Sequence, residues 1–330
     1  MVRQLLFVFR YATRHMKLTP LEIALTSPMP FELTEPLVRG HDRRKDEAWL
    51  TARLTDPTTE FIPIWKGENL LTRDPILAAR LAPADVAEVL PGAESVTYLG
   101  EHDERACFTI GLATGETAPL SAHGKWLNMR LLGERLPPAD WSVMAYARAM
   151  VYWHERHRYC GLCGSLTTSG LGGHVRRCTN SACATEHYPR TDPCIIVLVL
   201  SGERCLMGRQ PIWPAGRYST LAGFIEPGES AEQAVAREVY EEAGVHLGEV
   251  RFYGSQSWPF PASLMLGFHA QATTEEIHMH DGELGDARWF TRQELRAALD
   301  DGSVGLPMKV AISYRLIAAW FNREPVGGEL

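Results

Sequence analysis

The chain has 330 residues, 45% of them apolar, with a formal net charge of -7 and a pI near 6.0. This length can bury a sizeable core in two or three domains, while the acidic balance disfavours a general polyanion-binding surface, so any phosphate chemistry must bring its own cations. The longest apolar run, Cys194 to Leu200, is far shorter than the roughly 20 residues of a membrane-spanning helix, so we expect no integral membrane protein.

The N-terminal part mixes short alternating stretches and contains no catalytic motif. Its apolar run Leu5 to Phe9 predicts a first strand with basic flanks, although the cations that precede Glu22 also resemble a transit peptide. A helical pattern covers Arg73 to Leu90, with a start signal at Pro83. We expect an α+β domain over residues 1–140 in a cytoplasmic protein.

A helical stretch from Trp141 to His157 leads into a cysteine cluster. Two pairs of cysteines, separated by fourteen residues, provide four thiolates on two tight turns, which suits tetrahedral Zn²⁺. The surrounding segment is rich in glycine and cannot build an apolar core, so the zinc would be structural. We therefore expect a linker helix and a zinc ribbon over residues 141–193, with the ligands Cys160, Cys163, Cys178 and Cys183.

After Pro193 the pattern changes to short strands and helices. Strands are predicted at Cys194 to Leu200 and Arg204 to Met207, and a last helix near Met308 to Phe321. Residues 194–330 should therefore form a mixed α/β domain.

One helix of this domain carries a row of carboxylates. Ser230 and Gln233 form a capping box, and Gly244 supplies a left-handed stop. Glu238, Glu241 and Glu242 stand at positions i, i+3 and i+4, so they share a face and repel one another. Either solvent screens them or a cation lies among them, and oxygen ligands favour Mg²⁺ or Mn²⁺ over zinc.

The stretch Gly223 to Val245 resembles the Nudix box at every defined position: Gly, five residues, Glu, seven residues, Arg-Glu-aliphatic-any-Glu-Glu, any, Gly-aliphatic. The resemblance implies a Nudix α/β/α sandwich that hydrolyses diphosphates with Mg²⁺ or Mn²⁺. It further implies that Glu238 and Glu242 bind metal and that Glu241 is a ligand or acts in catalysis. Arg237 and Glu229 would orient these carboxylates, and Ala222 would offer its carbonyl oxygen.

The segment Ser255 to Ser263 resembles the SQPWPFPxS motif of NADH pyrophosphatases, with Ser257 in place of a proline. Its aromatic rings can stack on bases, and Gln256 and Ser263 can hydrogen-bond. Near the end, Glu283 would complete the metal site, with Asp286 as the reserve. The resemblance assigns substrate contacts to Tyr188, Gln256, Ser257, Trp258, Pro259, Phe260, Pro261, Ala262, Ser263 and Ser313.

By resemblance, the chain cleaves NADH to reduced NMN and AMP, accepts NAD⁺ and the NAD cap of RNA, forms a homodimer and binds no specific DNA sequence. Two alternatives stay open. Another Nudix specificity, such as ADP-ribose or a dinucleoside polyphosphate, would use the same box. A zinc-ribbon RNA-binding protein with an inert hydrolase domain could use Arg176, Arg177 and His174, although a few cations on a ribbon are more often a solvated face.

Overall fold

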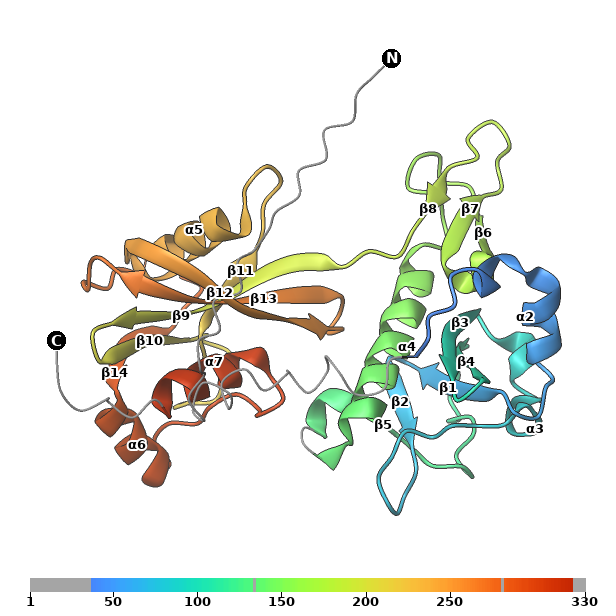
Figure 1. Ribbon diagram of the computed structural model, residues 1–330, viewed down its shortest axis with the longest axis horizontal. Helices are drawn as coiled ribbons and strands as arrows, with labels where there is room; N and C mark the ends of the chain where they lie inside the picture. Colours follow the sequence, from blue (N-terminus) through green and yellow to red (C-terminus); the bar gives the residue numbers. More distant parts are fainter. Residues whose placement is uncertain (1–36, 133–134, 280–281, 323–330) are drawn as a thin grey trace, which may run out of the picture.

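The computed structural model describes residues 37–132, 135–279 and 282–322. Figure 1 shows two lobes, with a small three-stranded unit beside the first of them. The predicted strand Leu5 to Phe9 lies outside the described residues. Within the described ranges, none of the helices combines the length and apolar content needed to cross a bilayer.

The first lobe is a five-stranded sheet in the order β3-β4-β1-β2-β5, in which only β1 and β4 run parallel. Short helices surround it, and the long helix α4 crosses its inner face. The elements are η1 (Arg43–Lys45), α2 (Glu47–Arg53), β1 (Glu60–Trp65), β2 (Glu68–Leu71), α3 (Pro83–Val86), η2 (Leu90–Gly92), β3 (Ser95–His102), β4 (Arg105–Leu112), β5 (Lys125–Leu127), η3 (Met129–Leu131) and α4 (Pro138–Arg156).

The helix predicted from Arg73 to Leu90 is largely wrong, because only α3 and η2 are helical there. The segment before α3 bonds instead to the sheet, where the Ala79 amide donates to the Leu70 carbonyl oxygen at 3.0 Å. Pro75 also disfavours helical backbone in the residue before it. Tertiary pairing therefore overrides the local pattern.

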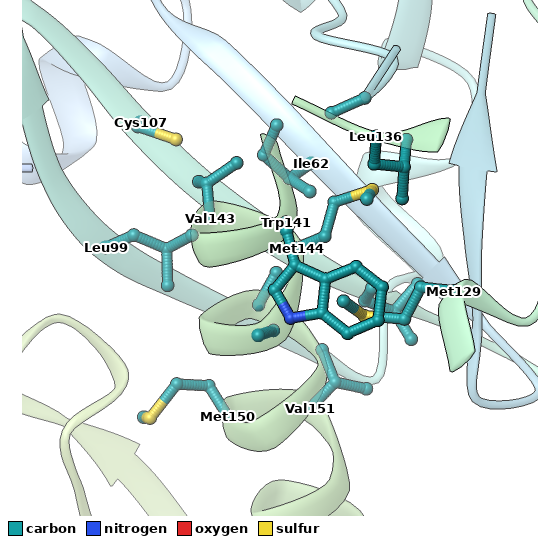
Figure 2. Packing of buried hydrophobic residues seen from close by; sticks show 14 of the residues in the cluster. Ile62, Leu99, Cys107, Met129, Leu136, Trp141, Val143, Met144, Met150 and Val151 are labelled. Carbon is teal, nitrogen blue, oxygen red and sulfur yellow. The ribbon is translucent and has the colours of Figure 1, made fainter. Parts of the chain in front are cut away.

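Helix α4 confirms the predicted linker helix and begins slightly earlier, at Pro138. Figure 2 shows its apolar face, where the Trp141 indole packs beside Met129 and Met144. Trp141 is only 2% exposed. The helix is thus part of the core of the first lobe, and it connects that lobe to the cysteine cluster.

The small unit consists of β6 (Thr167–Gly170), η5 (Leu171–Gly173), β7 (Val175–Cys178) and β8 (Glu186–His187), with strand order β6-β7-β8. It docks on the first lobe, since His174 Nε2 lies 2.8 Å from the Tyr98 carbonyl oxygen and donates to it. Gly173 has φ of 93°, and a β-carbon there would stand 2.5 Å from Thr97 Oγ1, so this close approach requires glycine.

The second lobe is built around a six-stranded sheet in the order β12-β13-β9-β10-β14, with β11 also paired to β9. Helix α5 covers one face, and α6 and α7 lie on the other (Figure 1). The elements are β9 (Asp192–Ser201), β10 (Arg204–Arg209), β11 (Leu221–Phe224), α5 (Ala231–Ala243), β12 (Leu247–Trp258), β13 (Ser263–Ala272), β14 (Asp286–Thr291), α6 (Arg292–Asp300) and α7 (Ile312–Phe321).

This arrangement confirms the predicted mixed α/β domain and both of its first strands. The last helix begins at Ile312 rather than near Met308. The reason is a cap from another strand: the Gln256 side chain accepts from the Ile312 amide at 2.8 Å. This contact satisfies one of the amides that every helix N-terminus leaves open.

Candidate active site and zinc site

Helix α5 is defined by its own sequence. Ser230 Oγ accepts from the Gln233 amide at 3.2 Å, and Gln233 Oε1 accepts from the Ser230 amide at 2.7 Å, which confirms the predicted capping box. At the other end Gly244 adopts φ of 70°. Local chemistry thus fixes both ends of the helix that carries the glutamates.

The three glutamates differ in burial. Glu242 is 4% exposed, and Glu238 is half-buried against β11. Glu241 lies at the solvent edge, with half of its side chain exposed. The shared face predicted from the sequence therefore has an inner part that points at the sheet and an outer part that meets water.

The inner part rests on the backbone of β11. A β-carbon on Gly223 would lie 1.9 Å from Glu238 Cδ, so only glycine leaves room for this carboxylate. Ala222 is the preceding residue of the same strand. The carboxylate and this stretch of backbone are thus close together, which is the kind of oxygen-rich surrounding that hard divalent cations use.

Arg237 binds several acceptors around the glutamates. Its Nη2 donates to Glu229 Oε1 at 2.6 Å and to the Phe224 carbonyl oxygen at 2.9 Å. Its Nη1 donates to Glu238 Oε1 at 2.9 Å and to Glu241 Oε2 at 3.0 Å. The guanidinium therefore joins the loop before α5 to the carboxylates and restrains their orientation.

The electrostatics of this cluster follow from burial and from neighbouring charges. Burial raises the pKa of Glu238, against the opposing hydrogen bond from Arg237, and the charges of Glu241 and Glu283 raise it further. The hydrogen bond from Arg237 lowers the pKa of Glu229, and the same bond raises the pKa of Arg237. An excess of buried negative charge is what a bound cation would relieve.

The two candidates for the metal ligand outside α5, Glu283 and Asp286, lie in different surroundings. Glu283 lies near enough to Glu238 for its charge to raise the pKa of that residue. Asp286 begins β14, and its carboxylate accepts from Tyr218 Oη and pairs with Arg288. Because side chains alternate along a strand, Asp286 shares the face of Phe290, on the side of the sheet opposite α5. The reserve assignment to Asp286 thus has no support in the geometry.

The four predicted zinc ligands come together in the small unit. All four sulfur atoms lie within 4.8 Å of one another, with Cys163 and Cys178 at 3.4 Å and Cys160 and Cys183 at 3.8 Å. Tetrahedral Zn²⁺ with sulfur at about 2.3 Å requires sulfur atoms about 3.8 Å apart. Among the described residues, these four cysteines are the one group of three or more His, Cys, Asp or Glu side chains that is already gathered around a metal-sized site.

A histidine that was not among the predicted ligands, His187, also lies at this site. Its Nε2 lies 3.3 Å from Cys160 Sγ, which places an imidazole beside one of the sulfur atoms. A histidine outside the regular cysteine spacing gave no signal in the sequence.

The predicted substrate loop is in fact the end of a hairpin. Ser255 to Trp258 belong to β12, and a tight turn with a cis Phe260–Pro261 bond leads into β13. The rings of Trp258 and Phe260 meet edge to face, 5.1 Å apart. The two aromatic side chains therefore form one compact unit at the tip of the hairpin.

The remaining predicted contacts occupy different surroundings. Gln256 is 2% exposed and binds backbone at the start of α7, donating to the Val310 carbonyl oxygen at 2.8 Å. Ser313 is buried in the first turn of α7. Tyr188 is 55% exposed, and its hydroxyl donates to Glu186. Ser257 and Pro261 are exposed, and Pro259 is buried. Their contacts with substrate remain predictions.

Three family models match the chain in succession. An NADH pyrophosphatase-like rudimentary NUDIX domain matches residues 58–153, an NADH pyrophosphatase zinc ribbon domain matches residues 155–188, and a NUDIX domain matches residues 190–307. These matches confirm the resemblances found in the sequence and the expected order of fold types.

Curated relatives agree over most of the chain. NAD-capped RNA hydrolase NUDT12 of Homo sapiens is 32% identical over 336 residues, covering 88% of this chain and 72% of the relative. NAD-capped RNA hydrolase NudC of Stutzerimonas stutzeri is 40% identical over 226 residues, covering 68% of this chain and 77% of the relative. The NAD-capped RNA hydrolase NudC of Mycobacterium tuberculosis is 40% identical over 274 residues, covering 78% and 87%.

Proposed function

Because this chain belongs to the Nudix family, in the branch that carries an NADH pyrophosphatase zinc ribbon, we propose that it hydrolyses the diphosphate bond of NAD(H). The products would be NMN(H) and AMP, and the same reaction would remove the NAD cap from RNA 5′ ends. The relatives named NAD-capped RNA hydrolase support this proposal. The observation that carries it is the Glu238 carboxylate packed on Gly223, beside the buried Glu242.

The domain type implies a divalent metal, and we propose Mg²⁺ or Mn²⁺. The residues present suit such an ion, since Glu238 and Glu242 offer only oxygen atoms in a half-buried setting next to the Ala222 backbone. Glu283 would complete the ligand set. A bound ion supplies charge neutralisation for the diphosphate and activation of water.

The residues around that ion would accept the proton, orient the carboxylates and bind the substrate. Glu241 stands at the solvent edge and is the proposed acceptor of the proton from the attacking water. Arg237 and Glu229 would hold the carboxylates in place through their mutual ion pair of 2.6 Å. The aromatic pair of the hairpin, Trp258 and Phe260, would bind a flat base.

The zinc ribbon implies a structural zinc, and its four sulfur atoms surround a site of the right size. We further propose a homodimer that covers apolar side chains such as Leu131 and Ile212, which are 82% and 86% exposed. A cytoplasmic location fits the seven cysteines, none of which forms a disulfide. The domain limits at residues 140 and 193 also remain proposals.

The substrate assignment is tested by comparing kcat/KM for NADH, NAD-capped RNA, ADP-ribose and diadenosine polyphosphates with Mn²⁺ present. We expect NADH and the capped RNA to be preferred by about tenfold or more, since the branch-specific hairpin would contact the second nucleotide. A preference for ADP-ribose would contradict the proposal. Tight, salt-dependent RNA binding without metal-dependent cleavage would favour the inert RNA-binding alternative.

A further inference from the structure

The tip of the β12–β13 hairpin leaves the core of its own domain and packs on the first lobe. Trp258 and Phe260 join the apolar cluster formed around α4, together with Val310 and Met308 from the segment before α7. The hairpin extends from the second lobe toward α4 (Figure 1). The surroundings of its aromatic side chains are therefore set partly by the N-terminal domain.

One residue of α4 contacts two successive residues of the turn. Arg148 Nε donates to the Pro259 carbonyl oxygen at 2.9 Å. The same guanidinium lies 5.2 Å from the centre of the Phe260 ring, within the range of a cation–π contact. A hydrogen bond and a ring contact together restrain both the turn backbone and the Phe260 side chain.

The guanidinium of Arg148 is confined on its other side by the β1–β2 turn. A β-carbon on Gly67 would stand 3.1 Å from Arg148 Nη1. Nη1 is buried, and among the described residues it has no hydrogen-bond partner. Burial also lowers the pKa of Arg148.

A half-buried cation with one fully buried, unpaired nitrogen is costly. Within the described part of the chain, only the charges of Glu155 and Glu68 favour the Arg148 cation, and they do not outweigh the loss of hydration, since the pKa of Arg148 is lowered. An apolar side chain of similar length would fill the same space at lower cost, so packing alone does not account for an arginine here. The contacts that an apolar side chain could not make are those with Pro259 and Phe260.

We propose that Arg148 is a positioning residue, through which the first lobe holds the β12–β13 turn, with Trp258 and Phe260, in the shape that receives the dinucleotide. This proposal rests on the proposed function. It gives the first lobe an indirect part in substrate binding, through the hairpin that it holds.

The test compares Arg148→Met and Arg148→Lys with a matched control, Arg156→Met. Arg156 lies on the same helix and stacks on Tyr152 at 5.2 Å, but it is exposed. Each variant is assayed for kcat and KM with NADH and Mn²⁺, and for the Kd of NADH without divalent metal, from NADH fluorescence. Zinc content and Tm are measured in parallel.

We expect Arg148→Met to raise both KM and Kd by about tenfold while kcat stays within about threefold, because binding geometry and not the metal site is disturbed. Arg148→Lys, which keeps the cation, should lie between Arg148→Met and the unmodified protein, and Arg156→Met should match the latter. If Arg148→Met behaves like Arg156→Met, or if kcat falls with Kd unchanged, the inference is wrong.

Two further outcomes are separable. If Arg148→Met does not fold, Arg148→Lys and Arg148→Gln decide the matter: a raised Kd supports the inference and an unchanged Kd overturns it. If the unmodified protein does not cleave NADH, the proposed function is wrong. That result is distinct from a failure of the Arg148 inference, which is decided by the Kd values of the variants.

Discussion

The Glu238 carboxylate lies against the Gly223 backbone, so closely that a β-carbon on Gly223 would stand 1.9 Å from Glu238 Cδ. Fourteen residues of chain lie between the two, and they include the loop that Arg237 binds through Glu229 and the Phe224 carbonyl oxygen. The contact joins helix α5 to strand β11, and it places a carboxylate beside the backbone of Ala222.

Gly223→Ala should therefore displace Glu238 and lower activity by about a hundredfold, since a shift of about 1 Å in a catalytic group can have an effect of that size. Gly92→Ala is the matched control, because a β-carbon at Gly92 meets nothing within 4 Å. Steady-state kinetics and Tm of both variants check the prediction. Equal activity in the two would show that the close contact is not needed.

Glu242→Gln removes one negative charge from the buried part of the glutamate row and keeps the side-chain shape. We expect activity to fall by about a hundredfold or more while the circular dichroism spectrum is unchanged, because a metal ligand is weakened. Glu232→Gln, in the exposed first turn of the same helix, should leave kcat unchanged. Normal turnover by Glu242→Gln would exclude a ligand role for this residue.

Glu283→Gln and Asp286→Asn should separate the two candidate outer ligands. Glu283→Gln should weaken Mn²⁺ binding, measured by electron paramagnetic resonance, by about tenfold or more. Asp286→Asn should leave Mn²⁺ binding unchanged and lower Tm by a few degrees, since it weakens the contacts of Asp286 with Tyr218 and Arg288. The reverse pattern would reinstate Asp286 as the ligand.

The interface between α4 and the zinc ribbon should weaken in acid. His154 is 2% exposed, donates from Nε2 to the Gly173 carbonyl oxygen at 2.8 Å and accepts at Nδ1 from Arg176 Nη1 at 2.9 Å, so the ring is neutral. Burial, followed by the charge of Arg176, lowers the pKa of His154 from 6.5 to about 4.

As the pH falls, His154 is therefore protonated near pH 6.5 in the unfolded chain but only near pH 4 in the folded chain. The free energy of unfolding should fall across this window by at most about 1.4 kcal/mol per pH unit, and this histidine should have no effect above it. Tm measured from pH 7.5 to pH 4.5 checks the trend, with His154→Gln as the control. Acid release of zinc would lower Tm in both proteins equally. An identical pH slope in both would therefore assign the acid effect to a cause other than His154 and contradict this account.

Local sequence was sufficient wherever neighbours along the chain decide the structure. The capping box of Ser230 and Gln233, the stop at Gly244 and the spacing of the four cysteines all follow from short-range chemistry. These short-range features are sufficient to predict α5 and the zinc site without any tertiary contact.

Contacts between segments far apart in the chain could not be predicted from the sequence. The face on which Asp286 lies depends on the register of β14 with β10, and a shift of one residue would reverse it. The contact of Arg148 with Pro259 joins residues 111 positions apart. The helix predicted from Arg73 failed for the same reason, because pairing with β1 and β2 decides that backbone.

The central claim is that this chain splits the diphosphate of NAD(H) with water. Mass spectrometry of the products formed from NADH and Mn²⁺ in ¹⁸O-labelled water tests it most directly. The account predicts reduced NMN and AMP, with one ¹⁸O atom on the phosphate of only one of them. Release of nicotinamide with ADP-ribose, or NADH left intact, would contradict it.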